Sequence, residues 1–413
     1  MDTAALLAQL KTLPNCRVTD AAEMISFLPP DWTAPVALVE PNETAIITEI
    51  VLAAESAKVA IVPMGGGTKR FTGPPPQKDK PYLLLRLANC SKILAYEPDD
   101  LTVTCEPGLT LAELQNALAA KNQSLALDVP HPERATLGGI VSANGAGFQR
   151  GTYGAARDLL LGVRAIMAGG VAIAGGGRVV KNVAGYDVCK LFTGAWGTLG
   201  VLTEITLKVR AQVPAKQVLA WETPNLATAA KIGLALHHAQ LAPLFLLATN
   251  EYQNRPHLII CMEGASERVT WQAEEFARRL VAAGISSAPI SLSEANLSIL
   301  LNQQARDDHE TTLALRLSCL LTDLAETATK LESLGLAVTA DCLTGIVSCA
   351  SNESVTELSA RMLQAAPFES AFIWTRANAT ILERRGPTRP DAALNLALKN
   401  AIDPQNVFSP GRF

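Results

Sequence analysis

The most constraining feature of the chain is a strand–helix–strand pattern that ends in three consecutive glycines. Apolar runs at residues 35–40 and 59–64 predict strands, and residues 41–58 predict a helix because apolar side chains recur on one helical face. Gly65, Gly66 and Gly67 follow the second strand directly. Adjacent glycines cost about 1 kcal/mol each relative to alanine inside a helix or strand, so we expect the backbone there to approach something closely.

This glycine run is a candidate anion site. Loops that follow a strand of such a unit commonly hold anions through backbone N–H groups. Two structural interpretations remain open from this stretch alone: a helix C-cap followed by a turn, and an ordinary glycine-rich surface loop. A GxxxxGK[ST] phosphate loop is not present, because the glycines are too close to Lys69 and Arg70 stands where serine or threonine is needed. ATP or GTP hydrolysis therefore loses support.

Length and composition narrow the class of protein. A chain of 413 residues exceeds one ordinary core, so we expect at least two. Hydrophobic residues make up 48% and charged residues 18%, which is typical of a well-packed soluble protein. A formal charge of −4 without a basic cluster argues against a nucleic-acid partner. The segment MDTAALLAQLKTLPN lacks a basic n-region and a cleavage site, so we expect a cytoplasmic protein.

Cysteine and histidine spacing argues against a metal centre. The eight cysteines form no C-x-x-C pair, and the five histidines form no H-x-H or H-x-x-x-H pattern. This disfavours both an iron–sulfur cluster within the chain and structural zinc. Most cysteines lie in apolar contexts such as TVTCEPG, where a reduced cysteine acts as a small hydrophobic residue.

Residues 101–209 predict further strands around an unusual glycine-rich region. Thr110 and Glu113 have capping-box spacing at the start of a helix. Residues 129–170 are rich in glycine, alanine, serine and threonine, but they are neither repetitive nor highly charged. Small residues at this density between strands predict backbone wrapped around a large ligand rather than a flexible linker. Residues 201–209 close the region as a strand.

The sequence from about residue 215 differs in pattern, because it predicts longer helices and strands and contains few glycines. Helical patterns alternate with apolar strand patterns such as HLIICMEG and TLALRLSCLL. We expect a second domain in which a sheet is backed by helices.

Several motifs, taken in order, resemble the vanillyl-alcohol-oxidase-type (PCMH-type) FAD-binding family. They are EPNETAIITEIVLAAES, VPMGGGT, EPGLTLAELQNAL, ATLGGIVSANGAG, RGTYG, VVKNVAGYDVCKLFTGAWGTLGVLTEI and the terminal DPQNVFSPGR. The resemblance is strong over residues 35–212 and moderate at the C-terminus. It implies an α+β fold, with a two-subdomain FAD-binding domain at 1–212, a cap domain with an antiparallel sheet backed by helices at 213–380, and a segment at 381–413 that returns to the FAD domain.

The resemblance also implies which residues bind FAD. These are Pro63, Met64, Gly65, Gly66, Gly67, Thr68, Thr136, Leu137, Gly138, Gly139, Ser142, Asn144, Gly145, Gly147, Tyr153, Gly154, Lys181, Asn182 and Val201. An FAD pyrophosphate carries two negative charges, which suits convergent backbone N–H donors. Many members of the family tether FAD through a histidine after the glycine turn, whereas this chain has Thr68, Lys69 and Arg70, so we expect noncovalent FAD.

The resemblance implies oxidation of a 2-hydroxy acid such as glycolate or D-lactate, but catalytic residues are hard to locate. The histidine and carboxylate cluster that holds a metal in many such dehydrogenases is not found here. Arg316 is a candidate carboxylate anchor, with a surface ion pair as the structural alternative, and Lys181 is a weaker candidate.

The motifs and the missing catalytic cluster leave three functions open. The first is an FAD-binding subunit of a glycolate oxidase complex, with a sister FAD-binding catalytic subunit and an iron–sulfur subunit as partners. Membrane association would then be peripheral and made through those partners. The second is a self-sufficient FAD-dependent 2-hydroxyacid dehydrogenase, and the third is a non-catalytic scaffold that holds flavin.

Overall fold

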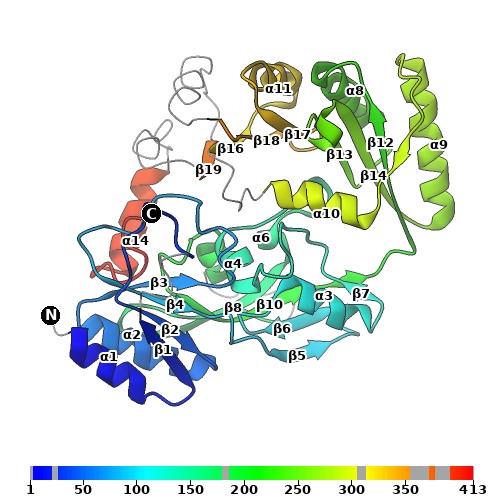
Figure 1. The fold of residues 1–413 in the computed structure, drawn as a ribbon. Coiled ribbons are helices and arrows are strands. Elements are labelled where there is room, and N and C mark those ends of the chain that lie inside the picture. The colour runs from blue at the N-terminus through cyan, green and yellow to red at the C-terminus, as the bar shows by residue number, and fades with distance from the viewer. Residues whose placement is uncertain are drawn as a thin grey trace.

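The computed structural model describes residues 3–20, 27–178, 186–304, 313–353, 372–376 and 391–412. The N-terminal half and the C-terminal helix form one body, and the strands from β12 onward form a second body above it in the view of Figure 1. Together they give a mixed α+β fold, as the sequence predicted.

The first sheet carries the glycine run at the end of one of its strands. Its order is β1 (Cys16–Asp20), β2 (Ala37–Pro41), β4 (Tyr82–Arg86), β3 (Ala60–Met64). Strands β2 and β3 are both parallel to β4, which lies between them. The predicted strand–helix–strand unit therefore forms, with α2 (Ile47–Ser56) in the connection, but its two strands are not neighbours. Helix α1 (Thr3–Thr12) packs with α2 over this sheet's core.

The second sheet is antiparallel, in the order β5 (Ile93–Glu97), β6 (Thr102–Cys105), β10 (Val201–Lys208), β8 (Leu160–Ile166), β9 (Ala172–Gly176). Its helices are α3 (Leu111–Ala119), α4 (Leu137–Ser142), α5 (Arg150–Tyr153), α6 (Ala156–Leu159) and α7 (Val188–Phe192), and a small ladder joins β7 (Gln123–Ser124) to β11 (Arg210–Ala211). The predicted capping box is confirmed: Thr110 Oγ1 accepts a hydrogen bond from the Glu113 N–H (3.2 Å), and the Thr110 N–H donates to Glu113 Oε2 (3.0 Å).

The third sheet has eight strands, and every pairing in it is antiparallel. The order is β15 (Ile290–Ser291), β12 (Ala215–Glu222), β14 (His257–Gly264), β13 (Phe245–Thr249), β17 (Ala337–Asp341), β18 (Ile346–Ser351), β16 (Leu313–Ser318), β19 (Phe372–Arg376). Three helices pack on one face: α8 (Leu226–His238), α9 (Ser266–Ala282) and α11 (Leu324–Ser333). The predicted antiparallel sheet backed by helices is confirmed.

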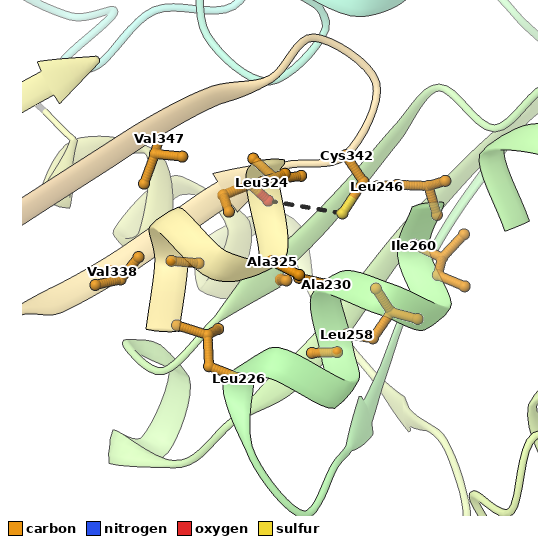
Figure 2. Close-up of a cluster of buried hydrophobic side chains, with 14 of the residues drawn as sticks. Leu226, Ala230, Leu246, Leu258, Ile260, Leu324, Ala325, Val338, Cys342 and Val347 are labelled. Carbon is orange, nitrogen blue, oxygen red and sulfur yellow. Dashed lines mark hydrogen bonds between the residues drawn. The ribbon is translucent and has the colours of Figure 1, made fainter. Parts of the chain in front are cut away.

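Both faces of this third sheet are apolar, because each is covered. Successive side chains of a strand point to opposite faces. Leu246 and Ala248 of β13 lie in the helix-side core. Figure 2 shows Leu246 in this cluster. Phe245 and Leu247 lie in a second cluster, with Phe148 of the first body and leucines of α10 (Glu294–Gln303). This second cluster joins the sheet to the first body.

The C-terminal segment packs against the first sheet. After α14 (Ala392–Ile402), Phe408 forms a parallel bridge with Ile61 of β3, and the Ser409 N–H donates to the Ile61 carbonyl (2.8 Å). Buried Lys399 donates to the carbonyls of Thr198 (2.7 Å) and Phe408 (2.9 Å) and is also paired with Asp403. These contacts fix the tail beside the strand that precedes the glycine run.

None of the helices among the described residues combines the length and apolarity that a membrane span requires. No group of three or more histidine, cysteine, aspartate or glutamate side chains among them could hold a metal ion.

Candidate functional site

The glycine run lines the larger of two adjoining cavities. This first cavity encloses about 1060 Å³ of space, part of which is open to solvent. Three stretches of chain line it: Val62–Arg70, Val129–Ala143 in part and Trp196–Leu202 in part. The single residues Trp32, Leu87 and Pro107, and Arg412 of the C-terminal tail, complete the lining. Most of these lining residues are apolar or glycine, with a few polar and basic side chains among them, which is the typical lining of a cofactor site.

The glycine run presents unpaired backbone donors. The N–H groups of Gly66, Gly67, Thr68 and Lys69 have no hydrogen-bond acceptor within the described residues. A buried or half-buried N–H group is costly to leave unpaired, so such a run indicates a ligand that accepts hydrogen bonds. An anionic group such as a pyrophosphate has this chemistry.

The same glycines are needed because the loop packs tightly on a second segment. A Cβ at Gly65 would lie 1.9 Å from Thr136 Oγ1, and one at Gly66 would lie 1.7 Å from the Arg134 carbonyl oxygen. The close neighbour expected from the sequence at these two positions is therefore the protein's own second segment. Gly139 differs, since the nearest atom to a Cβ there is Thr136 Oγ1 at 3.3 Å, and Gly139 lines the cavity.

Thr136 connects the two segments. Its side chain accepts a hydrogen bond from the Gly139 N–H (3.4 Å) and so caps α4, in which Gly138 and Gly139 line the cavity. The N–H groups of Leu137 and Gly138 donate to the carbonyls of Leu109 and Pro107. These two backbone donors are therefore occupied, whereas those of the glycine run are free.

Arg412 brings a positive charge into the first cavity from the C-terminus. Its Nη2 donates to the Thr72 carbonyl (3.0 Å), and its guanidinium carbon lies 4.7 Å from the centre of the Trp32 ring. Its Nη1 is buried and has no acceptor in the part of the chain that is described. Burial lowers the pKa of Arg412 to about 10, so the group stays charged near neutral pH.

The second cavity adjoins the first and lies between the two bodies. It encloses about 620 Å³, part of it open, and is lined by Lys69, Pro130, Ala146, Gly147, Phe148, Leu247, Leu301, Gln304, Arg316, Thr339, Asp341, Ile346 and Ser348. Lys69 and Pro130 line both cavities, so the two spaces meet beside them. Buried Gln304 Nε2 has no hydrogen-bond acceptor within the described residues.

Three ionisable side chains line this second cavity. Burial lowers the pKa of Arg316 to about 10, with a further contribution from Arg150 and an opposing one from Asp341. Burial, and then the Arg316 charge, lowers the pKa of Lys69 to about 8. Burial raises the pKa of Asp341, while hydrogen bonds from Thr344 and nearby N–H groups oppose the rise. Two basic groups therefore face one carboxyl group in a half-buried space.

Ten of the predicted FAD-binding residues line the first cavity together. They are Pro63, Met64, Gly65, Gly66, Gly67, Thr68, Thr136, Gly138, Gly139 and Ser142. Gly147 lines the second cavity instead. The lining of the first cavity does not include Leu137, Asn144, Gly145, Tyr153, Gly154 or Val201. Tyr153 instead donates to Glu263, and the Asn144 side chain accepts from the Arg157 N–H (3.2 Å). Lys181 and Asn182 lie outside the described residues.

Sequence reasoning missed several residues that line the cavities. Arg412 and Trp32 are far from the glycine run in sequence, and no local pattern singles them out. Trp196 and Gly197 lie within the quoted motif VVKNVAGYDVCKLFTGAWGTLGVLTEI, which was a usable signal. Lys69 stands out in the sequence only as a departure from other patterns. Arg316 lines the second cavity, and none of the described residues forms an ion pair with it within 4.0 Å.

The comparisons with known proteins agree with this geometry. Residues 35–175 match the family model described as an FAD binding domain. The chain thus contains an FAD-binding domain of the PCMH type, and the match confirms FAD as the predicted cofactor.

Among curated relatives, the chain is homologous to glycolate oxidase subunits. It is 39% identical over 164 residues to glycolate oxidase subunit GlcE of Escherichia coli, which covers 40% of the chain and 46% of the relative. It is 31% identical over 226 residues to subunit GlcD of Bacillus subtilis, which covers 55% of the chain and 47% of the relative. The matched region thus spans about half the length of these relatives.

The fold extends further than the sequence match. The crystal structure of p-cresol methylhydroxylase with substrate bound superposes with a TM-score of 0.76 at 15% identity, over 100% of this chain and 95% of that one. At this identity the likeness shows the shared fold alone. The chain therefore shares its overall fold with that protein.

Proposed function

We propose that this chain holds FAD noncovalently in the first cavity and oxidises a small 2-hydroxy acid in the second. One observation carries the proposal: the cavity lined by the FAD-binding segments opens beside Lys69 onto a second cavity that contains Arg316. The bound flavin would supply the oxidant, by accepting a hydride from the substrate carbon. The chain's own residues would bind, orient and deprotonate the acid.

The residues of the first cavity fit FAD. The free N–H groups from Gly66 to Lys69 suit the pyrophosphate oxygens, and the unpaired Nη1 of Arg412 suits a further anionic or carbonyl oxygen. At Gly139 the absence of a side chain leaves room for the cofactor. No histidine or cysteine is among the described residues that line the cavity, so we propose that FAD is held without a covalent bond.

The residues of the second cavity fit a small carboxylate. A guanidinium holds a carboxylate through two parallel hydrogen bonds, and Arg316 is half-buried, with no partner among the described residues closer than 4.0 Å. The unpaired Nε2 of Gln304 supplies a donor for a second substrate oxygen. Apolar Leu247, Leu301 and Phe148 limit the remaining space. This supports a short 2-hydroxy acid such as glycolate or D-lactate.

We further propose that the chain works as a subunit of a glycolate-oxidase-type complex. The relatives it matches are named as subunits, and the chain spans about half of their length. The eight cysteines form no C-x-x-C pair, so electrons would leave to an iron–sulfur partner rather than to a cluster of this chain. A sister FAD-binding subunit would be the other partner.

Anaerobic mixing of the FAD-loaded chain with glycolate or D-lactate tests the proposal. We expect the visible flavin absorbance to bleach without any partner, because both cavities belong to this chain. Arg316→Met should weaken substrate binding by about 30-fold or more, since a lost charge-assisted pair costs about 2 kcal/mol or more. Arg164→Met, which removes an exposed pair with Glu204, is the matched control and should change nothing.

The alternative is a flavin-holding scaffold. In that case the chain would be yellow, and no 2-hydroxy acid would reduce its flavin until the sister subunit was added. The free, half-buried Arg316 favours the catalytic assignment over the scaffold, because burying an unpaired charge without a ligand is costly.

A further inference from the structure

We propose that Lys69 is the proton acceptor of this oxidation, with its amine taking the proton of the substrate hydroxyl while Arg316 holds the carboxylate. The inference rests on the proposed function and adds a residue that neither the motifs nor the comparisons assign. It follows from the position, the surroundings and the lack of partners of this one side chain.

Lys69 lies where the two cavities meet. It follows the glycine run and lines both cavities. A proton acceptor must lie where the substrate hydroxyl meets the flavin, at the junction of the cofactor space and the substrate space. Arg316 acts electrostatically on Lys69 across this junction, so the two basic groups face the same space from different bodies.

The other ionisable side chains of the second cavity are less suited to accept a proton. The titratable groups among the described residues lining the second cavity are Lys69, Arg316 and Asp341. Arg316 stays protonated near neutral pH. Asp341 is committed to its own turn, because it accepts from Thr344 Oγ1 (2.6 Å) and from the Leu343 N–H (2.9 Å). The Lys69 side chain makes no hydrogen bond or ion pair within the described part of the chain.

The surroundings of Lys69 also favour the neutral form of its amine. Burial and the neighbouring Arg316 lower the pKa of Lys69 to about 8, so a useful fraction of the amine is neutral at mildly alkaline pH. The charged groups that face this space are Arg316 and Asp341, and Arg150 acts on Arg316 from α5. A carboxylate bound to Arg316 would offset the part of the lowering that the Arg316 charge causes, and would leave the larger part that burial causes.

The step balances. The C2–H bond breaks and its electron pair leaves as hydride to FAD, the oxidant of the proposed function. The O–H bond breaks, its electrons form the second C–O bond of the 2-oxo acid, and the proton goes to the Lys69 amine. The resulting ammonium then returns its proton to water.

Chemical rescue provides the main test. FAD-loaded wild type, Lys69→Ala and Lys69→Met are mixed anaerobically with glycolate or D-lactate over a range of pH. For both variants we expect flavin reduction to slow by about 100-fold or more, with the substrate Kd nearly unchanged and the rise in rate with pH lost. Methylamine should restore the rate of Lys69→Ala in proportion to the free base, but not that of Lys69→Met, whose side chain fills the space.

A second readout does not depend on turnover. Trace acetylation of the flavin-free folded chain with acetic anhydride, followed by mass spectrometry of the peptide that contains Lys69, gives the pKa of this amine. We expect half-maximal reactivity near pH 8, with exposed lysines such as Lys121 as internal controls for the reagent. Added oxalate should protect Lys69 in the wild type and not in Arg316→Met.

The outcomes separate the two proposals. If no 2-hydroxy acid bleaches the wild-type flavin, the proposed function fails and the role of Lys69 fails with it. If the wild type is bleached and Lys69→Ala is bleached equally fast, or slowly without rescue by amines, only the assignment of Lys69 is overturned. His309 lies outside the described residues, so His309→Ala is measured in parallel. Loss of the pH dependence in that variant, with Lys69→Ala unaffected, would also overturn the assignment.

Discussion

Arg412 donates a hydrogen bond to the backbone carbonyl of Thr72, 340 residues earlier in the chain. The contact places the C-terminal guanidinium beside the loop that follows the glycine run, with one nitrogen free inside the first cavity. A site that looks local in the sequence is therefore completed by the last residues of the chain.

Replacing Arg412 should weaken cofactor binding specifically. Arg412→Met keeps the stem that packs near Trp32 but removes the free donor, so the Kd for FAD should rise about 10-fold or more, as expected for a lost charged hydrogen bond of about 1.5–3 kcal/mol. Calorimetric titration of the flavin-free chain checks this. Arg164→Met should leave the Kd unchanged, and an equal loss in both variants would contradict the role of Arg412.

Alanine at two glycines should separate packing from cofactor contact. Gly66→Ala places a Cβ against the Arg134 carbonyl, so the flavin-free chain should lose about 1–3 kcal/mol of unfolding free energy. Gly139→Ala lies within α4, so the flavin-free chain should keep or slightly gain stability while FAD affinity falls. Urea unfolding and FAD titration of both variants measure the two effects. Full FAD affinity in Gly139→Ala would show that the cofactor stays away from α4.

The junction between the two bodies should depend on Glu263. This side chain accepts from Tyr153 and pairs with Arg210 Nη1 (2.9 Å), whose guanidinium carbon lies 4.4 Å from the centre of the Tyr153 ring. Glu263→Gln weakens both contacts, so we expect a loss of about 1–3 kcal/mol in urea unfolding. Exposed Glu267 on α9 offers the control, as Glu267→Gln should be neutral. Equal stability of the two variants would rule out a role for the junction.

The low pKa of Lys69 should appear in the pH dependence of stability. Its folded pKa of about 8 lies below its ordinary 10.5, so between these values the unfolded chain binds more protons. The free energy of unfolding should therefore rise with pH across this window, by about 1–3 kcal/mol from this group. Subtracting the curve of Lys69→Met from that of the wild type isolates the effect. A difference that stays flat from pH 7 to about 11 would contradict it.

Local patterns predicted much of the fold because the responsible contacts are local. The capping box at Thr110 depends on residues three apart, and the glycine run follows its strand within a few positions. The motifs identified FAD because several of them occur in the order typical of the family. The insertion of β4 between β2 and β3 could not be predicted, since either order buries the same apolar strands.

The substrate side of the site could not be predicted because it depends on how the two bodies dock. Lys69 and Arg316 line the second cavity from the two bodies, and no periodicity in the sequence relates residues so far apart. The purpose of Gly65 and Gly66 was similarly hidden, since a sequence indicates that backbone approaches something but not what. Here the neighbour is the segment that contains Thr136.

Fluorescence titration of FAD with the flavin-free, folded chain tests the central claim most directly. If the free N–H groups of the glycine run hold the pyrophosphate, flavin emission should change saturably at one FAD per chain, and Gly139→Ala should shift the curve to higher concentration. A chain that is folded by circular dichroism but leaves the FAD emission unchanged at every ratio would contradict the account.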